Sequence, residues 1–91
     1  MIEIIKVLES RALDDHRLWV RFSDGKQGVH DFAEMIAEGG VMVEPLRDPA
    51  MFRRVFIELG ALAWPNGFDL DSIALHGRMA AAGELTQAAV E

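Results

Sequence analysis

The chain has 91 residues, enough for one domain with a modest core. It has no cysteine, so disulfides, thiolate metal sites and cysteine nucleophiles are excluded. Nine basic against fifteen acidic residues give a net charge of −6, which argues against a general nucleic-acid or anionic-membrane surface. With no long apolar run and no signal-peptide pattern, we expect a cytoplasmic protein without membrane contact.

The first third of the sequence predicts a meander of strands. Residues 2–8 form an apolar, β-branched run. Apolar and polar residues alternate through residues 17–22, which puts Trp19 on the polar face of that strand. The dipeptide Asp24-Gly25 supplies the positive φ of a two-residue hairpin turn, so residues 26–30 should return antiparallel.

A short helix should follow this hairpin. Asp31 has the position of an N-cap, with Glu34 three residues later as in a capping box. The spacing of Phe32, Met35 and Ile36 gives the helix one apolar stripe, and the glycine pair at 39–40 should end it.

The second half predicts two more strands and another helix. After an irregular segment with one expected helical turn near Pro49, residues 52–59 alternate as a strand, and residues 61–64 return as a second one. Pro65-Asn66-Gly67 fits a type I turn, and Asp69 or Asp71 should cap a helix ending near His76.

Together these elements predict an α+β domain with a small antiparallel sheet of four to five strands and two short helices. We expect the domain to span residues 1–78 and residues 79–91 to form a helical or frayed tail that the fold does not need. The predicted core is Ile4, Val7, Leu18, Val20, Phe22, Phe32, Met35, Ile36, Leu46, Phe52, Val55, Ile57, Leu62, Trp64, Leu70 and Leu75.

Three blocks of the sequence resemble a known bacterial family, domain of unknown function 2442. They are Phe22-Ser23-Asp24-Gly25 with Asp31-Phe32, Pro45-Leu46-Arg47-Asp48-Pro49 with Phe52, and Trp64-Pro65-Asn66-Gly67-Phe68-Asp69-Leu70-Asp71. Their order and spacing match the family from about Ile4 to His76, whereas residues 79–91 lie beyond it. The resemblance implies a small α+β fold with no established catalytic activity. Some members of the family carry an added helix-turn-helix domain, for which this chain has no room, and others sit beside a second short protein in two-gene units that resemble toxin–antitoxin pairs.

The polar motifs of the chain favour structural roles over chemistry. Asp14-Asp15-His16 is most simply a solvated turn, although a metal site is conceivable there. Asp69-Leu70-Asp71 begins like a calcium loop, but Ile73 stands where the pattern needs a third acidic or amide side chain. Helix capping explains these two aspartates better than calcium binding does. The alternative is that they form part of a polar functional edge at residues 66–76.

Two tryptophans are candidate contact residues. Trp64 precedes a turn and should close the core, whereas Trp19 lies between two arginines and is either an exposed contact or covered by a helix or the tail. The basic cluster of Arg47, Arg53 and Arg54 is interpreted mainly as ion-pair partners.

The leading functional hypothesis is a non-enzymatic protein-interaction module without cofactor or metal. Its expected partner is a second copy, as a dimer through Trp19 or the edge of strand 52–59, or a small protein from a neighbouring gene. The alternative is a small-ligand or enzymatic site at the 66–76 edge. The candidate binding residues are Trp19, Trp64, Asn66, Asp69, Asp71 and His76.

Overall fold

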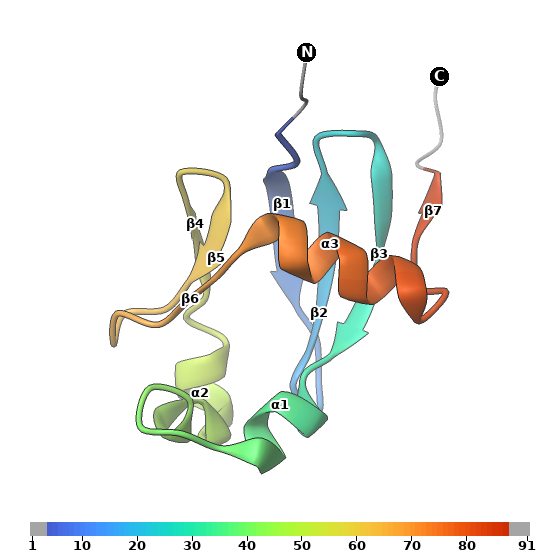
Figure 1. Cartoon of the computed structure of the whole chain (residues 1–91). Coiled ribbons are helices and arrows are strands. Elements are labelled where there is room, and N and C mark those ends of the chain that lie inside the picture. The colour runs from blue at the N-terminus through green and yellow to red at the C-terminus, as the bar shows by residue number, and fades with distance from the viewer. Residues whose placement is uncertain (1–3, 88–91) are drawn as a thin grey trace.

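The computed structural model describes residues 4–87, which form an α+β fold built on two antiparallel sheets (Figure 1). The expected fold class is thereby confirmed. In chain order the elements are β1 (Val7–Ala12), β2 (Arg17–Phe22), β3 (Lys26–Asp31), α1 (Ala33–Glu38), the 3-10 helix η1 (Glu44–Arg47), α2 (Pro49–Phe52), β4 (Phe56–Glu58), β5 (Ala61–Ala63), β6 (Asp69–Leu70), α3 (Ser72–Ala81) and β7 (Thr86–Gln87).

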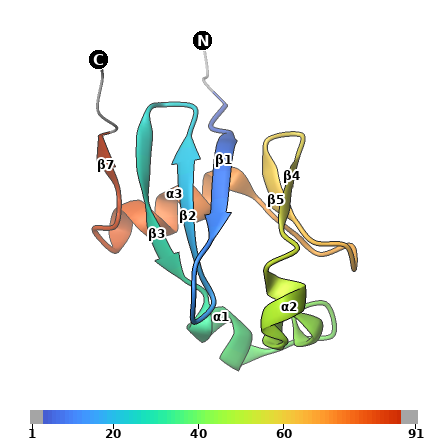
Figure 2. The same cartoon turned by 180° about the vertical axis from the view of Figure 1, so that it is seen from behind.

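The strands divide into a four-stranded sheet of order β1-β2-β3-β7 and a three-stranded sheet of order β4-β5-β6. The smaller sheet lies beside β1, where the backbone N–H of Val7 donates to the carbonyl of Gly60 at 2.8 Å. Helix α3 crosses one face of the larger sheet (Figure 1). Seen from behind, no described helix or strand lies over its opposite face (Figure 2).

The β2–β3 hairpin forms where Asp24-Gly25 predicted it, but its loop is one residue longer than expected. Strand β2 ends at Phe22 and β3 begins at Lys26, which leaves three residues between them. Gly25 takes φ +87° and donates its N–H to the carbonyl of Phe22 at 3.0 Å. This is the three-residue hairpin in which a glycine occupies the left-handed position after a turn.

The expected strand over residues 52–59 is wrong at both ends. Asp48 accepts a hydrogen bond from the backbone N–H of Ala50 at 3.0 Å and starts α2, so Phe52 belongs to a helix. Only Phe56–Glu58 is extended. Leu59 does not share a buried face with Val55 and Ile57, because it turns at φ +52° and is 98% exposed.

Residues 79–87 are not separate from the domain, contrary to expectation, whereas the last part of the predicted tail, residues 88–91, lies outside the described residues. Helix α3 does not end near His76 but continues to Ala81, and Met79 on it is fully buried. Strand β7 then pairs with the first two residues of β3. The buried positions Leu75 and Met79 are four residues apart and form one stripe on the sheet side of α3, a pattern too short to stand out in the sequence.

The core lies between α3, the covered face of the larger sheet and the helices at the end of the molecule. The predicted core residues that are buried are Val7, Leu18, Val20, Phe22, Phe32, Ile36, Leu46, Phe52, Leu62, Trp64 and Leu75, while Met35, Val55, Ile57 and Leu70 pack against them partly buried. Ile4 is 62% exposed, so its assignment to the core is wrong. Val43, Ala63 and Met79 are additional buried residues. No helix within residues 4–87 is long and apolar enough to cross a membrane.

Candidate functional site

The uncovered face of the four-stranded sheet brings one tryptophan and several charged side chains together. Leu18, Val20 and Phe22 are fully buried, so the alternate residues of β2 point away from α3. The strand register places their cross-strand partners beside them. We call this surface the Trp19 face, and it consists of Glu9, Arg11, Arg17, Trp19, Arg21, Gln27, Val29 and Asp31.

Trp19 stands at the centre of this face, half-buried by its neighbours rather than by a helix. It lies opposite Arg11 on β1 and Val29 on β3. The guanidinium carbon of Arg11 is 5.6 Å from the centroid of the indole ring, a cation–π distance. Of the alternatives that the sequence left open, covering by a described helix is ruled out, because α3 lies on the other face (Figures 1 and 2). The end of the tail, residues 88–91, lies outside the described residues.

The charged groups around Trp19 are held by exposed contacts. Arg21 donates through Nη2 to Oε1 of Glu9 at 3.1 Å, with both side chains more than one third exposed. Arg17 donates through Nε to the carbonyl of Asp14 at 3.0 Å. Pairs of this kind contribute little to stability, so these side chains remain available to a partner.

Trp64, the other predicted contact residue, is a core residue. It is 1% exposed, and its indole N–H donates to the carbonyl of Phe52 at 2.9 Å. Its ring also packs against Phe52 and Phe68. Trp64 therefore closes the core, as the sequence predicted, and its side chain is not accessible to a ligand.

Three of the four predicted residues of the 66–76 edge, Asn66, Asp71 and His76, make structural contacts with different parts of the chain. Asn66 donates through Nδ2 to the carbonyl of Met42 at 2.8 Å. Asp71 caps α3 by accepting from the N–H groups of Ile73 and Ala74, whereas Asp69 is exposed in β6 and caps nothing. This polar edge is therefore built from turn and capping contacts.

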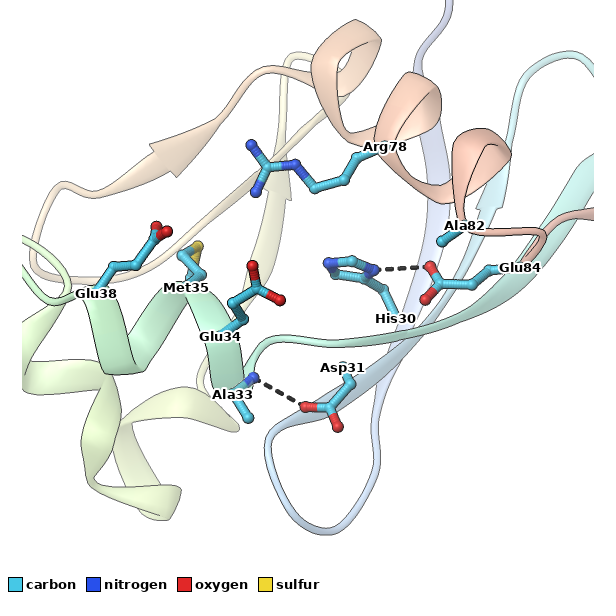
Figure 3. Close-up of a pocket in the computed structure, with 9 residues that line it drawn as sticks. All are labelled: His30, Asp31, Ala33, Glu34, Met35, Glu38, Arg78, Ala82 and Glu84. Atoms are coloured by element: carbon cyan, nitrogen blue, oxygen red, sulfur yellow. Dashed lines mark hydrogen bonds and ion pairs between the residues drawn. The ribbon is translucent and has the colours of Figure 1, made fainter.

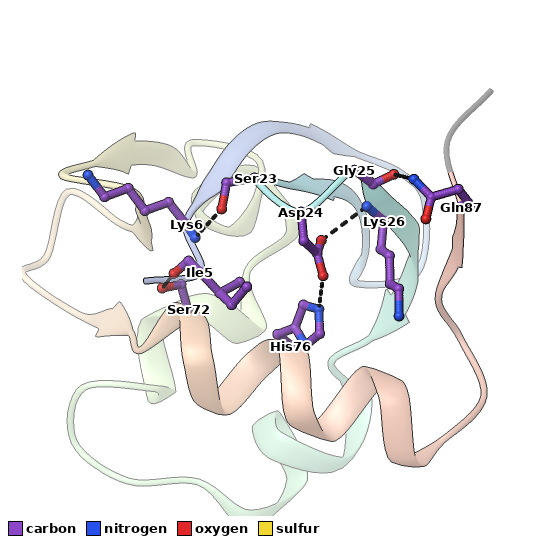
Figure 4. A network of polar contacts seen from close by, with 9 residues as sticks. All are labelled: Ile5, Lys6, Ser23, Asp24, Gly25, Lys26, Ser72, His76 and Gln87. Carbon is purple, nitrogen blue, oxygen red and sulfur yellow. Dashed lines mark hydrogen bonds and ion pairs between the residues drawn. The ribbon is translucent and has the colours of Figure 1, made fainter. Parts of the chain in front are cut away.

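His76 turns from this edge toward the β2–β3 hairpin (Figure 4). Its Nε2 lies 2.8 Å from Oδ2 of Asp24, and because a carboxylate only accepts, Nε2 is the donor. The backbone N–H of Lys26 donates to the other Asp24 oxygen at 3.1 Å. Partial burial raises the pKa of Asp24, but these two hydrogen bonds and the charges of His76 and Lys26 outweigh it and hold that pKa below its usual value.

A cleft lies between α1 and the end of α3 (Figure 3). Its volume is about 680 Å³, and its charged lining includes Glu34, Glu38 and Arg78. On its sheet side Nδ1 of His30 lies 2.7 Å from Oε1 of Glu84 in a largely buried pair. Sequence reasoning missed this cleft because Glu84 comes from the tail, which was expected to lie outside the fold.

The turn at Asp14-Asp15-His16 is occupied by structural contacts. Asp14 pairs with Arg53 at 2.7 Å, and Nε2 of His16 lies 3.1 Å from the carbonyl of Arg47. Arg47 also pairs with Glu44 at 2.9 Å, so these two arginines of the basic cluster are ion-pair partners as interpreted. Within residues 4–87 no three His, Asp or Glu side chains are placed to hold a metal ion.

The comparison with family models matches residues 7–78 to the family described as "Protein of unknown function (DUF2442)". The match covers about four fifths of the 91 residues and includes all of the Trp19 face, but it ends before Met79, Glu84 and β7. Neither the comparison with curated proteins nor that with solved structures gave a significant match.

Proposed function

This chain belongs to the DUF2442 family of proteins of unknown function, and we propose that it is a non-enzymatic protein-interaction module that binds through the Trp19 face. The observation that carries the proposal is an indole ring at the centre of a sheet face over which no described element packs (Figure 2). Antiparallel sheets commonly leave one face to solvent, but that face is normally polar. A tryptophan at the centre of such a face departs from that rule, and a role in contacting a partner would explain why it is there.

The composition around Trp19 supports the same proposal. Tryptophan and arginine are the side chains most enriched at the energetic centres of protein interfaces. Here Arg11, Arg17 and Arg21 surround the ring on two adjacent strands. The backbone of the face is already ordered, because β2 is paired on both sides, so binding costs little backbone entropy.

A partner from a neighbouring gene fits the proposal better than a dimer formed through sheet edges. The outermost strands on the far sides of the two sheets are β7 and β6, which have two residues each within the described part of the chain. The edge of β4, which the sequence suggested as a dimer contact, lies beside β1 (Figure 1). Short or covered edges are poor templates for strand pairing.

A small-ligand site is the second candidate, and the cleft between α1 and α3 favours it over the 66–76 edge. The volume of about 680 Å³ is in the usual range of ligand pockets. Its lining is mostly charged rather than apolar, which is unlike most such pockets, so we place it second.

Sedimentation analysis tests the proposed function. The full chain would be run alone at micromolar concentration and mixed with the purified product of the adjacent gene. We expect a complex heavier than the 10.1 kDa chain, lost in Trp19→Ala and kept in Val41→Ala, a matched loss of an exposed apolar side chain elsewhere. Sedimentation of the chain as a free 10.1 kDa monomer in every run would contradict the proposal for this partner and for a dimer.

A further inference from the structure

We propose that the occupant of the Trp19 face is a short acidic segment of a partner protein that carries an aliphatic side chain for the indole ring. This inference rests on the proposed function and adds the chemistry of the partner. It follows from three properties of the face: its charge, its size and the fact that the backbone groups of β2 are already hydrogen-bonded within the sheet.

The charge of the Trp19 face is opposite in sign to that of the rest of the chain. The face holds three arginines against two carboxylates, Glu9 and Asp31, whereas the whole chain has nine basic and fifteen acidic residues. A third of the basic residues are therefore concentrated on this one surface. Complementary charge attracts an acidic partner to this face, whereas the rest of the chain carries a net negative charge that opposes its binding there.

The size of the face fits a segment rather than a folded domain. Three strands of six residues form it. At the usual strand spacing and rise they present roughly 300 Å². A standard interface buries about 800 Å² on each partner, so a second globular surface would extend well beyond this face. A short extended or helical segment would not.

Recognition on this face must come from side chains. Strand β2 is hydrogen-bonded to β1 and β3, so its backbone groups are not free to pair with an added strand. Arg11 lies over the ring of Trp19, and Val29 borders it from β3. An aliphatic side chain packed between Trp19 and Val29 would place flanking carboxylates near the three guanidinium groups.

Two other occupants are less favoured by these charges. Single-stranded nucleic acid also stacks on aromatic rings beside arginines, but its binding sites follow the backbone along a basic groove, whereas the three arginines here lie around one ring. A second copy docked symmetrically would bring the same three arginines against each other. The oligonucleotide becomes an outcome of the experiment below, and self-association is measured by the sedimentation of the chain alone.

Fluorescence anisotropy with defined probes tests the inference on the full chain. The probe is a labelled twelve-residue peptide in which Asp and Glu alternate with Leu, compared with the same peptide carrying Lys in place of each acid and with a labelled uridine oligonucleotide. We expect saturable binding of the acidic peptide only. The affinity should fall about tenfold or more in Trp19→Ala, fall in Arg11→Gln and at high salt, and stay unchanged in Val41→Ala.

Equal binding of the Lys peptide or the oligonucleotide, or acidic binding indifferent to both Trp19→Ala and Arg11→Gln, would overturn the inference. Arg11→Gln changes only an exposed side chain, so it keeps the test valid if Trp19→Ala does not fold. If the peptides fail while the sedimenting complex depends on Trp19, the partner chemistry is wrong and the proposed function stands. If the complex is absent as well, both are wrong.

Discussion

At the scale of single residues, Asp24 links the β2–β3 hairpin to α3 through its contact with His76. Its pKa lies below the usual value, so in acid the unfolded chain binds a proton that the folded chain does not. The stabilisation is therefore present above the unfolded-state pKa and is lost as the pH falls through the lower folded-state pKa.

We predict that Asp24→Asn lowers the free energy of unfolding by about 1–2 kcal/mol at pH 7, because a charged acceptor of two hydrogen bonds is replaced by a neutral one. The difference between the two proteins should shrink as the pH is lowered through the folded-state pKa of Asp24. Urea unfolding over a pH series measures both, with Asp69→Asn, an exposed carboxylate, as the matched control. A difference that does not change with pH would show that the ionisation of Asp24 is not the source.

Gly28 is required for close packing of the tail on β3. A Cβ at this position would lie 2.0 Å from the carbonyl oxygen of Glu84, which is backbone and has little freedom to move away. We predict that Gly28→Ala lowers the thermal unfolding midpoint by several degrees.

Gly77→Ala is the matched control for that substitution. A Cβ on Gly77 meets no atom within 4 Å, and the residue lies within α3, where alanine is favoured by about 1 kcal/mol. This variant should raise the midpoint. Equal midpoints for the two variants would mean that Glu84 does not pack against β3 as described.

At the scale of elements, the β4–β5 hairpin carries a strained turn. Its two loop residues, Leu59 and Gly60, have φ +52° and +80°, so both lie in the left-handed region, as in a type I′ turn. Leucine is disfavoured there, and its side chain is 98% exposed and contributes little packing.

We predict that Leu59→Asn stabilises the protein by about 1 kcal/mol, because asparagine tolerates the left-handed region and favours this turn. Thermal and urea unfolding measure the gain. Leu8→Asn, at a half-exposed leucine in β1 with ordinary φ, should give none. A stability loss in Leu59→Asn would show that the leucine has a packing role.

The end of α3 and β7 form a second element whose removal should be costly. Truncation after Arg78 deletes the fully buried Met79 and the Glu84 partner of His30. We predict a loss of about 3 kcal/mol or more, since emptying a buried methionine site alone costs about 2–5 kcal/mol. Met79→Ala separates that core contribution from the rest. An unchanged unfolding midpoint in both proteins would restore the view that the tail is dispensable.

At the scale of the whole molecule, short-range patterns in the sequence located the elements better than their ends or partners. Alternation in β2, the Asp24-Gly25 turn and the Asp71 cap depend on neighbours in the chain, and all three are present. The division into two sheets depends on which strands meet in space. The tail can pack on β3 because Gly28 has no side chain to block it. A glycine adds nothing to the hydrophobic pattern, so the sequence contains no indication of this contact.

The candidate site divides in the same way. The period-2 pattern placed Trp19 on the outer face of β2 without knowledge of the fold. The gathering of Arg11 and Val29 around it needed the register with β1 and β3, which the sequence does not state. The 66–76 edge resembled a binding site in the sequence because helix caps and turns use the same polar residue types as binding sites. In the structure Asn66, Asp71 and His76 make structural contacts instead.

Binding of a partner at the Trp19 face can be observed directly through the two indole N–H groups of the chain. The measurement is the ¹H–¹⁵N correlation spectrum of the full chain during titration with the acidic peptide. We predict that the indole signal of Trp19 shifts together with amides of β1, β2 and β3, while that of the buried Trp64 does not. Shifts confined to residues of the cleft between α1 and α3, with the Trp19 signal unmoved, would contradict the account.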